Sequence, residues 1–233
     1  MVSIKEYADL IKSLPVGGQF TKIKRGSTFW NRTDFFDDEK EVVKVVKVVK
    51  DVFDECSGDN NYIKISRDDI KKTSDTKKKI VKILMWGYPG GGRYGQVQNI
   101  LQYMDVLTNW LEKIKDNNFD SVENALPHDA LGNLLEINGL GLSTISKLLY
   151  FFNVKIGGCP CQIYDGKVIN SLNKNHQIQE LSERDNWRRT YDDYKNYINL
   201  LSELSENCEY SPDQIELFLF MINNSFNLGK DEN

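Results

Sequence analysis

Residues 134–147 read LLEINGLGLSTISK, in which a Gly-x-Gly turn separates two apolar segments. We expect two short helices, over residues 128–136 and 142–152, joined by a tight turn at Gly139 and Gly141. Glycine accepts a positive φ and lets the backbone approach another surface closely. The amides that open the second helix lack intrahelical acceptors and can bind a phosphate oxygen. The stretch predicts either a hairpin that holds a phosphate backbone or a plain αα-hairpin with a glycine turn.

The remainder of the chain is predicted to be mostly helical, because apolar residues recur every three or four positions. Residues 19–25 (QFTKIKR) alternate as a strand does but also fit a loop, and residues 155–162 are expected to be irregular. The predicted helices cover residues 3–14, 37–53, 75–86, 96–116, 121–126, 166–172, 187–206 and 212–226.

The segment 37–53 contains Val-Val-Lys three times in succession. As a helix it places Lys44, Lys47 and Lys50 on one stripe and valines on the other sides. We interpret the lysine stripe as a solvated face and not as a surface for nucleic acid.

The composition is that of a globular protein with enough apolar residues for one larger domain or two small lobes, since 40% of its 233 residues are hydrophobic. The first thirteen residues lack the apolar run of an export signal, and no apolar run is long enough for a bilayer, so we expect a cytoplasmic protein. The net charge of −4 counts against a nucleic-acid partner. Residues 131–175, however, carry four basic and two acidic side chains, so a local basic face remains available.

The cysteines do not form a disulfide framework in a chain of this length without an export signal. Cys159-Pro160-Cys161 has the form of half a metal site, but a tetrahedral site needs two more ligands. The candidates for these are all distant in sequence: Cys56, Cys208, His128 and His176. We therefore expect free thiols, no metal and no cofactor.

The hairpin and an aspartate after it resemble one known family. Residues 137–146 resemble the hairpin of the helix-hairpin-helix (HhH-GPD) superfamily of DNA glycosylases, in which Leu-Pro-Gly-Val-Gly is usual; Asn138 replaces the proline. That family carries an aspartate downstream, ahead of another helix, and Asp165 in QIYDGKV (residues 162–168) matches it. The spacing from Ser143 to Asp165 is slightly longer than usual, and GGCP (residues 157–160) can absorb the excess.

Two further segments resemble particular branches of this superfamily. Residues 165–168, Asp-Gly-Lys-Val, are similar to the branch that removes adenine opposite oxidised guanine. Residues 214–220 (QIELFLF) resemble the closing helix of 8-oxoguanine DNA glycosylases. The resemblance covers about a third of the chain, and the first seventy residues match nothing.

The resemblance implies a mainly α, two-lobed HhH-GPD glycosylase fold with a DNA-binding cleft between the lobes. It divides the chain into an N-terminal helical or irregular region (1–73), a helical core with the Gly-rich loop, the hairpin and the aspartate (74–174), and C-terminal helices (175–233). The last segment is expected to pack back on the core, either as a separate unit or as one domain with the N-terminal region.

The resemblance also implies the chemistry. Breaking an N-glycosidic bond develops positive charge on the sugar, which the carboxylate of Asp165 would stabilise while it orients a water molecule. The alternative for Asp165 is a helix N-cap, and the two roles are compatible. Bifunctional members form a Schiff base through a lysine at the position of Ser143, so a serine there implies a monofunctional enzyme. Lys147, one turn later, remains open as a displaced nucleophile or as a contact to phosphate or solvent.

The enzyme would extrude its target base and hold it between flat or apolar side chains. Two sets of residues are expected to contact DNA, and for each the alternative is an ordinary structural role. The hairpin and the following helix start contribute backbone contacts from Gly139, Gly141, Ser143, Thr144, Lys147 and Lys167. The Gly-rich loop contributes the base pocket or a wedge in the duplex, from Trp86, Tyr88, Arg93, Tyr94 and Gln96.

The sequence thus predicts a monofunctional, monomeric DNA glycosylase that acts on double-stranded DNA. The resemblance extends to a role in bacterial DNA repair or in defence against phages. The alternative is a non-catalytic helix-hairpin-helix module that binds DNA or a protein, and the acidic total charge favours it slightly.

Overall fold

The computed structural model describes residues 3–27, 29–30, 39–92, 95–126, 137, 139–175, 178–181, 186–206 and 209–223. The fold is mainly helical, as the sequence predicted. The first helix of the hairpin, expected over residues 128–136, lies outside the described residues. None of the helices in the described ranges has the length and apolar character needed to cross a bilayer.

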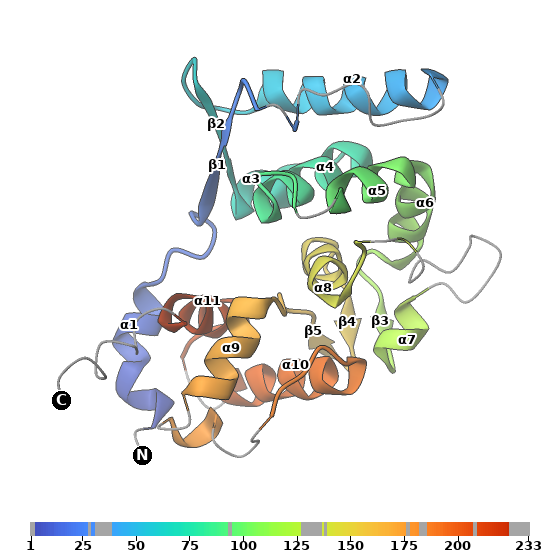
Figure 1. The fold of residues 1–233 in the computed structure, drawn as a ribbon. Helices are drawn as coiled ribbons and strands as arrows, with labels where there is room; N and C mark the ends of the chain where they lie inside the picture. Colours follow the sequence, from blue (N-terminus) through green and yellow to red (C-terminus); the bar gives the residue numbers. More distant parts are fainter. Residues whose placement is uncertain are drawn as a thin grey trace.

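Figure 1 shows the helices and strands of the first half of the chain. They are η1 (Ile4–Tyr7), α1 (Ala8–Ser13), β1 (Phe20–Lys24), α2 (Glu39–Glu55), β2 (Tyr62–Ser66), α3 (Arg67–Lys72), α4 (Thr76–Gly87), α5 (Gln96–Gln102) and α6 (Met104–Ile114). The second half contains β3 (Asn118–Phe119), α7 (Val122–Ala125), α8 (Leu142–Phe151), β4 (Lys155–Ile156), β5 (Cys159–Pro160), α9 (Gly166–Lys174), η3 (Gln179–Leu181), α10 (Tyr191–Glu206) and α11 (Pro212–Ile222).

The first and last described helices lie in the same part of the molecule. In Figure 1, α2 to α6 and the β1–β2 pair lie in the upper part, and α1, α9, α10 and α11 lie in the lower part. Helix α1 packs on α11, where the Gln214 side chain donates to the Lys12 carbonyl (2.9 Å). Helix α8 lies between the two parts and packs against α4. The first helix therefore belongs with the C-terminal helices in space.

Three details differ from the sequence expectations. Strand β1 forms as predicted, but its antiparallel partner β2 was not expected. The predicted helix over 96–116 is interrupted at Tyr103, which separates α5 from α6. The expectation of irregular structure over 155–162 was wrong, because β4 pairs with β3 and with β5. The β3–β4 pairing joins segments far apart in sequence, so local patterns do not reveal it, whereas β4 and β5 are joined by a tight turn at Gly157 and Gly158.

The repeated Val-Val-Lys segment forms helix α2, with the stripe of lysines that the spacing predicted. Lys44, Lys47 and Lys50 are exposed, whereas Val45 and Val49 are buried in the core. The lysine stripe therefore faces solvent.

Candidate active site

The glycine turn that precedes α8 contains Gly139 and Gly141, which have different surroundings. Gly139 has a φ of +99°, and a Cβ atom there would lie 2.8 Å from the Gln96 carbonyl oxygen, so no side chain fits. Gly141 precedes α8 with an extended backbone, and its carbonyl accepts from the amides of Thr144 (2.8 Å) and Ile145 (3.0 Å). A Cβ atom on Gly141 would meet open space. Only Gly139 is therefore required by the packing.

Gly139→Ala is expected to lower the free energy of unfolding by about 2 kcal/mol or more, from backbone strain and the contact with Gln96. Gly141→Ala is the matched control and should change it by less than about 0.5 kcal/mol, because its backbone suits any residue. Urea unfolding of both variants measures the difference. Equal losses in the two would show that the turn does not require glycine at position 139.

The Gly-rich loop is hydrogen-bonded through its side chains to the glycine turn and to the first turn of α8. The Tyr88 hydroxyl bonds to Thr144 Oγ1 (2.7 Å), and the Gln96 amide donates to the Gly139 carbonyl (2.8 Å). Thr144 is fully buried, so its side chain faces this loop and not solvent. Arg93 and Tyr94, predicted for the same loop, lie outside the described residues. The loop and the start of α8 are therefore held together by these hydrogen bonds.

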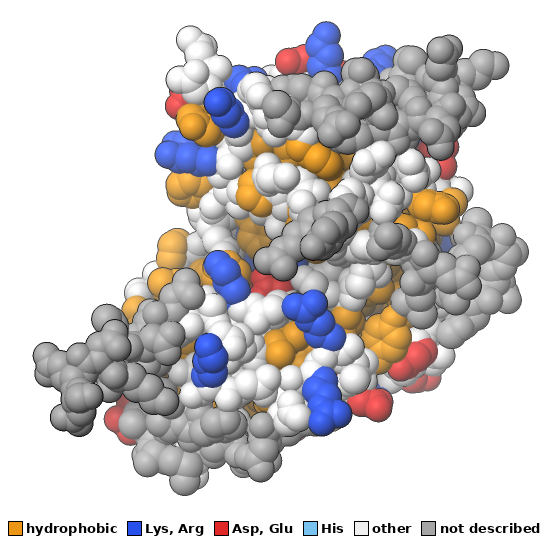
Figure 2. All heavy atoms as spheres, in the orientation of Figure 1, with side chains coloured by type: hydrophobic (Ala, Val, Ile, Leu, Met, Phe, Trp, Pro, Cys, Tyr) orange, Lys and Arg blue, Asp and Glu red, His pale blue; other side chains and the backbone are white. Residues whose placement is uncertain are grey.

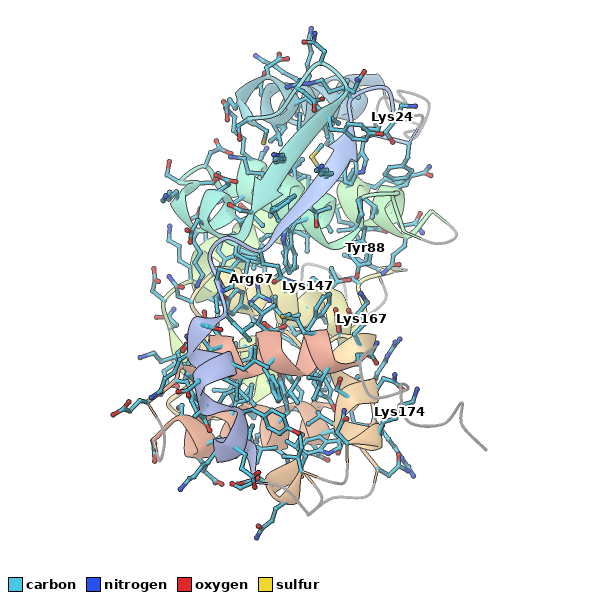
Figure 3. The ribbon with its side chains drawn as sticks, turned by 90° about the vertical axis from the view of Figure 1, so that its left-hand side faces the viewer. Lys24, Arg67, Tyr88, Lys147, Lys167 and Lys174 are labelled. Atoms are coloured by element: carbon cyan, nitrogen blue, oxygen red, sulfur yellow. The ribbon has the colours of Figure 1, made fainter. Side chains whose placement is uncertain are left out.

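Lys147 points back along α8 toward Ser143. Its ammonium group donates to the Ser143 carbonyl (3.0 Å) and to Ser143 Oγ (2.9 Å), and it lies 5.7 Å from the centre of the Tyr88 ring. The Lys147 side chain is buried. In Figure 3 it lies toward the interior, whereas Lys24, Lys167 and Lys174 lie along the edge that also carries Tyr88. The structure thus places the Lys147 amine beside Ser143.

Asp165 forms the N-cap of α9. Its Oδ1 accepts from the amides of Lys167 (2.9 Å) and Val168 (3.1 Å). The preceding residue is tied to α8, since the Tyr164 amide donates to Ser146 Oγ (3.0 Å). The Asp165 carboxyl is half-buried and close enough to Glu216 to contribute to its raised pKa. The capping role is therefore present, and it holds the carboxylate in one place.

A pocket of about 590 Å³ opens beside the hairpin. It brings together three residues that the sequence singled out, Tyr88, Gln96 and Ser143. The rest of its lining is Pro89, Gly90, Gly92 and Arg189. Asp165 is not part of the lining, but its neighbour Gly166 is next to it: a Cβ atom on Gly166 would lie 2.9 Å from Arg189 Nη2. Arg189 was missed from the sequence, because it sits in the acidic end of the chain with no motif around it.

Trp86 lies in the core and does not line this pocket. Its indole nitrogen donates to the Gln19 carbonyl (3.3 Å), and its ring meets Phe151 edge-on with centroids 5.7 Å apart. Its other neighbour is the Arg67 guanidinium, 5.3 Å from the ring centre. Trp86 therefore packs in the core, in the last turn of α4.

A buried ion pair lies behind the site and joins α3 to α11. Arg67 and Glu216 are both fully buried, and Arg67 Nη2 lies 2.5 Å from Glu216 Oε2. The Arg67 guanidinium also bonds to Gln19 Oε1 (2.6 Å) and lies between the rings of Trp86 and Tyr150. Burial raises the pKa of Glu216 to about 7, although Arg67 opposes the rise. No sequence pattern links these two residues.

Basic side chains lie on the face that carries the pocket. Lys167 and Lys174 of α9 and Arg189 are exposed, and Lys167 Nζ lies 4.4 Å from the centre of the Phe220 ring. Figure 2 shows Lys and Arg side chains spread over this face of the molecule. This face therefore carries basic side chains although the net charge of the chain is −4.

The structure contains no group of three or more potential metal ligands among the described residues. Cys56, Cys159 and Cys161 are free thiols, whereas Cys208, His128 and His176 lie outside the described residues. Burial raises the pKa of the Cys161 thiol to about 12 against a hydrogen bond from Tyr194 that lowers it, so this thiol is no nucleophile near neutral pH.

Comparison with known proteins supplies one match. A family model described as "Putative 8-oxoguanine DNA glycosylase OGG-like protein" matches residues 30–220. This range contains the Gly-rich loop, the hairpin, Asp165 and Arg189. No curated protein and no solved structure matches the chain.

Proposed function

The chain belongs to the OGG-like family of 8-oxoguanine DNA glycosylases, and from this membership we propose that it hydrolyses the N-glycosidic bond of a modified, oxidised or mispaired base in double-stranded DNA. The observation that carries the proposal is the pocket of about 590 Å³ beside the start of α8. Arg189 lines this pocket and lies against Gly166, the residue that follows Asp165. The pocket is large enough to admit a nucleotide, as expected for an enzyme that extrudes its target.

We place the duplex across the face that carries the pocket, in a cleft between the upper and lower parts. The amides of Leu142 and Ser143 open α8 without intrahelical acceptors, which favours contact with a DNA phosphate. Gly141, exposed and with open space at its Cβ position, lets the backbone approach. Lys167 is exposed near the start of α9 and would contact a second phosphate. The side chains of Thr144 and Lys147 point inward, so these residues would hold Tyr88 and Ser143 in place and would not contact DNA themselves.

Asp165 is the proposed catalytic carboxylate. As the bond between C1′ and the base breaks, its negative charge would stabilise the positive charge on the sugar. A water molecule oriented by the same carboxylate then adds hydroxide to C1′, and its proton ends on the departing base. The hydrogen bonds from α9 leave Asp165 Oδ2 without a backbone donor, so this oxygen would face the sugar.

The enzyme is proposed to be monofunctional, because a serine at position 143 cannot form an imine. The Lys147 amine is hydrogen-bonded to the carbonyl and the hydroxyl of Ser143, which supports a positioning role for it. Borohydride added during turnover should therefore trap no covalent complex with DNA. An adduct that disappears in Lys147→Ala would identify Lys147 as the nucleophile and overturn this part of the proposal.

The activity is tested on duplexes that each carry one modified or mispaired base, with alkali to cut the abasic product. The set includes oxidised purines and the modified bases of phage genomes, so that it tests repair and defence alike. Strand cleavage after alkali supports the glycosylase. Binding of these duplexes without release of any base would instead support the non-catalytic helix-hairpin-helix module.

A further inference from the structure

We propose that Arg189 binds the backbone phosphate of the extruded nucleotide and so positions its sugar beside Asp165; this inference rests on the proposed glycosylase function. Arg189 lines the pocket together with residues of the Gly-rich loop and Ser143 of α8. Its side chain is exposed, and within the described residues the structure records no hydrogen bond or ion pair for its guanidinium group. Its donors are therefore available to a ligand.

The backbone that leads to Arg189 is anchored by hydrogen bonds at the two residues before it. Trp187 exchanges two hydrogen bonds with the Asn173 side chain, through its amide (2.7 Å) and its carbonyl (2.9 Å). The Arg188 carbonyl accepts from the Tyr164 hydroxyl (2.9 Å), and the Arg188 amide donates to Asp193 Oδ2 (2.8 Å). Since Tyr164 directly precedes Asp165, the same contacts fix Arg189 relative to the proposed catalytic carboxylate.

Gly166 makes room for the guanidinium group. Arg189 Nη2 occupies the space beside the first residue of α9, where a Cβ atom would come within 2.9 Å. A larger residue at position 166 would push the end of the Arg189 side chain away. The glycine thus brings a cation next to Asp165 without a recorded ion pair between them.

The charges around the pocket indicate what Arg189 binds. One wall carries its guanidinium group, and another carries Ser143, whose amide in the first turn of α8 has no intrahelical acceptor. Both favour an anion, and in a nucleotide the only charged group near neutral pH is the phosphate. A guanidinium group donates two parallel hydrogen bonds to phosphate oxygens, which fixes orientation as well as distance.

The inference is tested with a duplex that contains a stable abasic-site analogue, because this probe has the phosphates but no base to read. Binding is measured by fluorescence anisotropy at several salt concentrations. Arg189→Ala should weaken binding about tenfold and lower the salt dependence by about one phosphate contact. Lys72→Ala, which removes one exposed charge outside this pocket, is the control and should do neither.

A second variant moves the guanidinium group without removing it. Gly166→Ala places a methyl group against Arg189 Nη2, so it should weaken binding in the same direction by a smaller factor. An Arg189→Ala variant with unchanged affinity and salt dependence would overturn the inference, and so would a loss seen only with base-containing DNA. Failure of the unaltered protein to bind any duplex would instead remove the proposed function, and the inference with it.

Discussion

Asp165→Asn should abolish most base release and leave the protein folded. Asparagine caps a helix as well as aspartate does, so the hydrogen bonds to the amides of Lys167 and Val168 remain. The substitution removes only the negative charge that would stabilise the sugar in the transition state. Loss of one such electrostatic contact costs about 10²- to 10³-fold in rate, and we expect at least this loss. Single-turnover base release, measured with alkaline cleavage, gives the rate.

The matched control is Asp75→Asn. Asp75 caps α4 through a hydrogen bond from the Lys78 amide (2.8 Å), and it does not line the pocket. The same chemical change there should leave both the rate and the melting temperature unaltered. Full activity in Asp165→Asn would exclude this carboxylate from catalysis and reduce Asp165 to a helix cap.

Glu216→Leu should destabilise the fold by about 3–5 kcal/mol, because it leaves the Arg67 guanidinium buried without its partner. Arg67→Met should cost less, since Glu216 can take up a proton, whereas arginine stays charged. The double variant should recover most of the loss, because neither charge remains in the core. Urea unfolding of the four proteins gives the coupling between the two residues.

An exposed ion pair of the same length is the control for this cycle. Lys12 Nζ and Glu209 Oε2 also lie 2.5 Å apart, but water reaches both side chains. Glu209→Leu should shift the urea midpoint far less than Glu216→Leu does. Equal shifts would show that burial does not set the strength of the Arg67–Glu216 pair.

The same pair predicts how stability depends on pH. Folded Glu216 binds a proton up to about pH 7, whereas the unfolded carboxyl releases it near pH 4.5. The folded state holds more protons than the unfolded state in this interval. The contribution of Glu216 to the free energy of unfolding therefore falls as the pH rises from 4.5 to 7. The loss is on the order of 3 kcal/mol at 1.36 kcal/mol per pKa unit. Glu216→Gln should lack this slope, and an identical slope would assign it to other groups.

Much of the local structure could be predicted from the sequence. The start of α8 after Gly141, the cap at Asp165 and the exposed lysine stripe of α2 each depend on residues a few positions apart. Backbone geometry and helical spacing act over that range, so the pattern of residue types is enough. The resemblance to one family likewise rested on the short segments around the hairpin and Asp165, and the family match bears it out.

The candidate site needed more than this. Ser143 and Asp165 were selected from their order along the chain, but the sequence did not reveal Arg189 or the pocket that it lines. The sequence also left open where the Lys147 side chain points. In the structure its amine lies beside the Ser143 hydroxyl. These outcomes depend on how α8, α9 and the loop before α10 pack together.

The sequence by itself determined the glycine turn that precedes α8, the position of the capping aspartate and the mainly helical class, because local backbone preferences act within one or two helical turns. Only the tertiary structure decided which side chains meet at the pocket and which charges are buried together. Arg67 and Glu216 are 149 positions apart, and Arg189 reaches Gly166 from another element. Such contacts arise from the packing of whole helices, and desolvation then sets their charges and strengths.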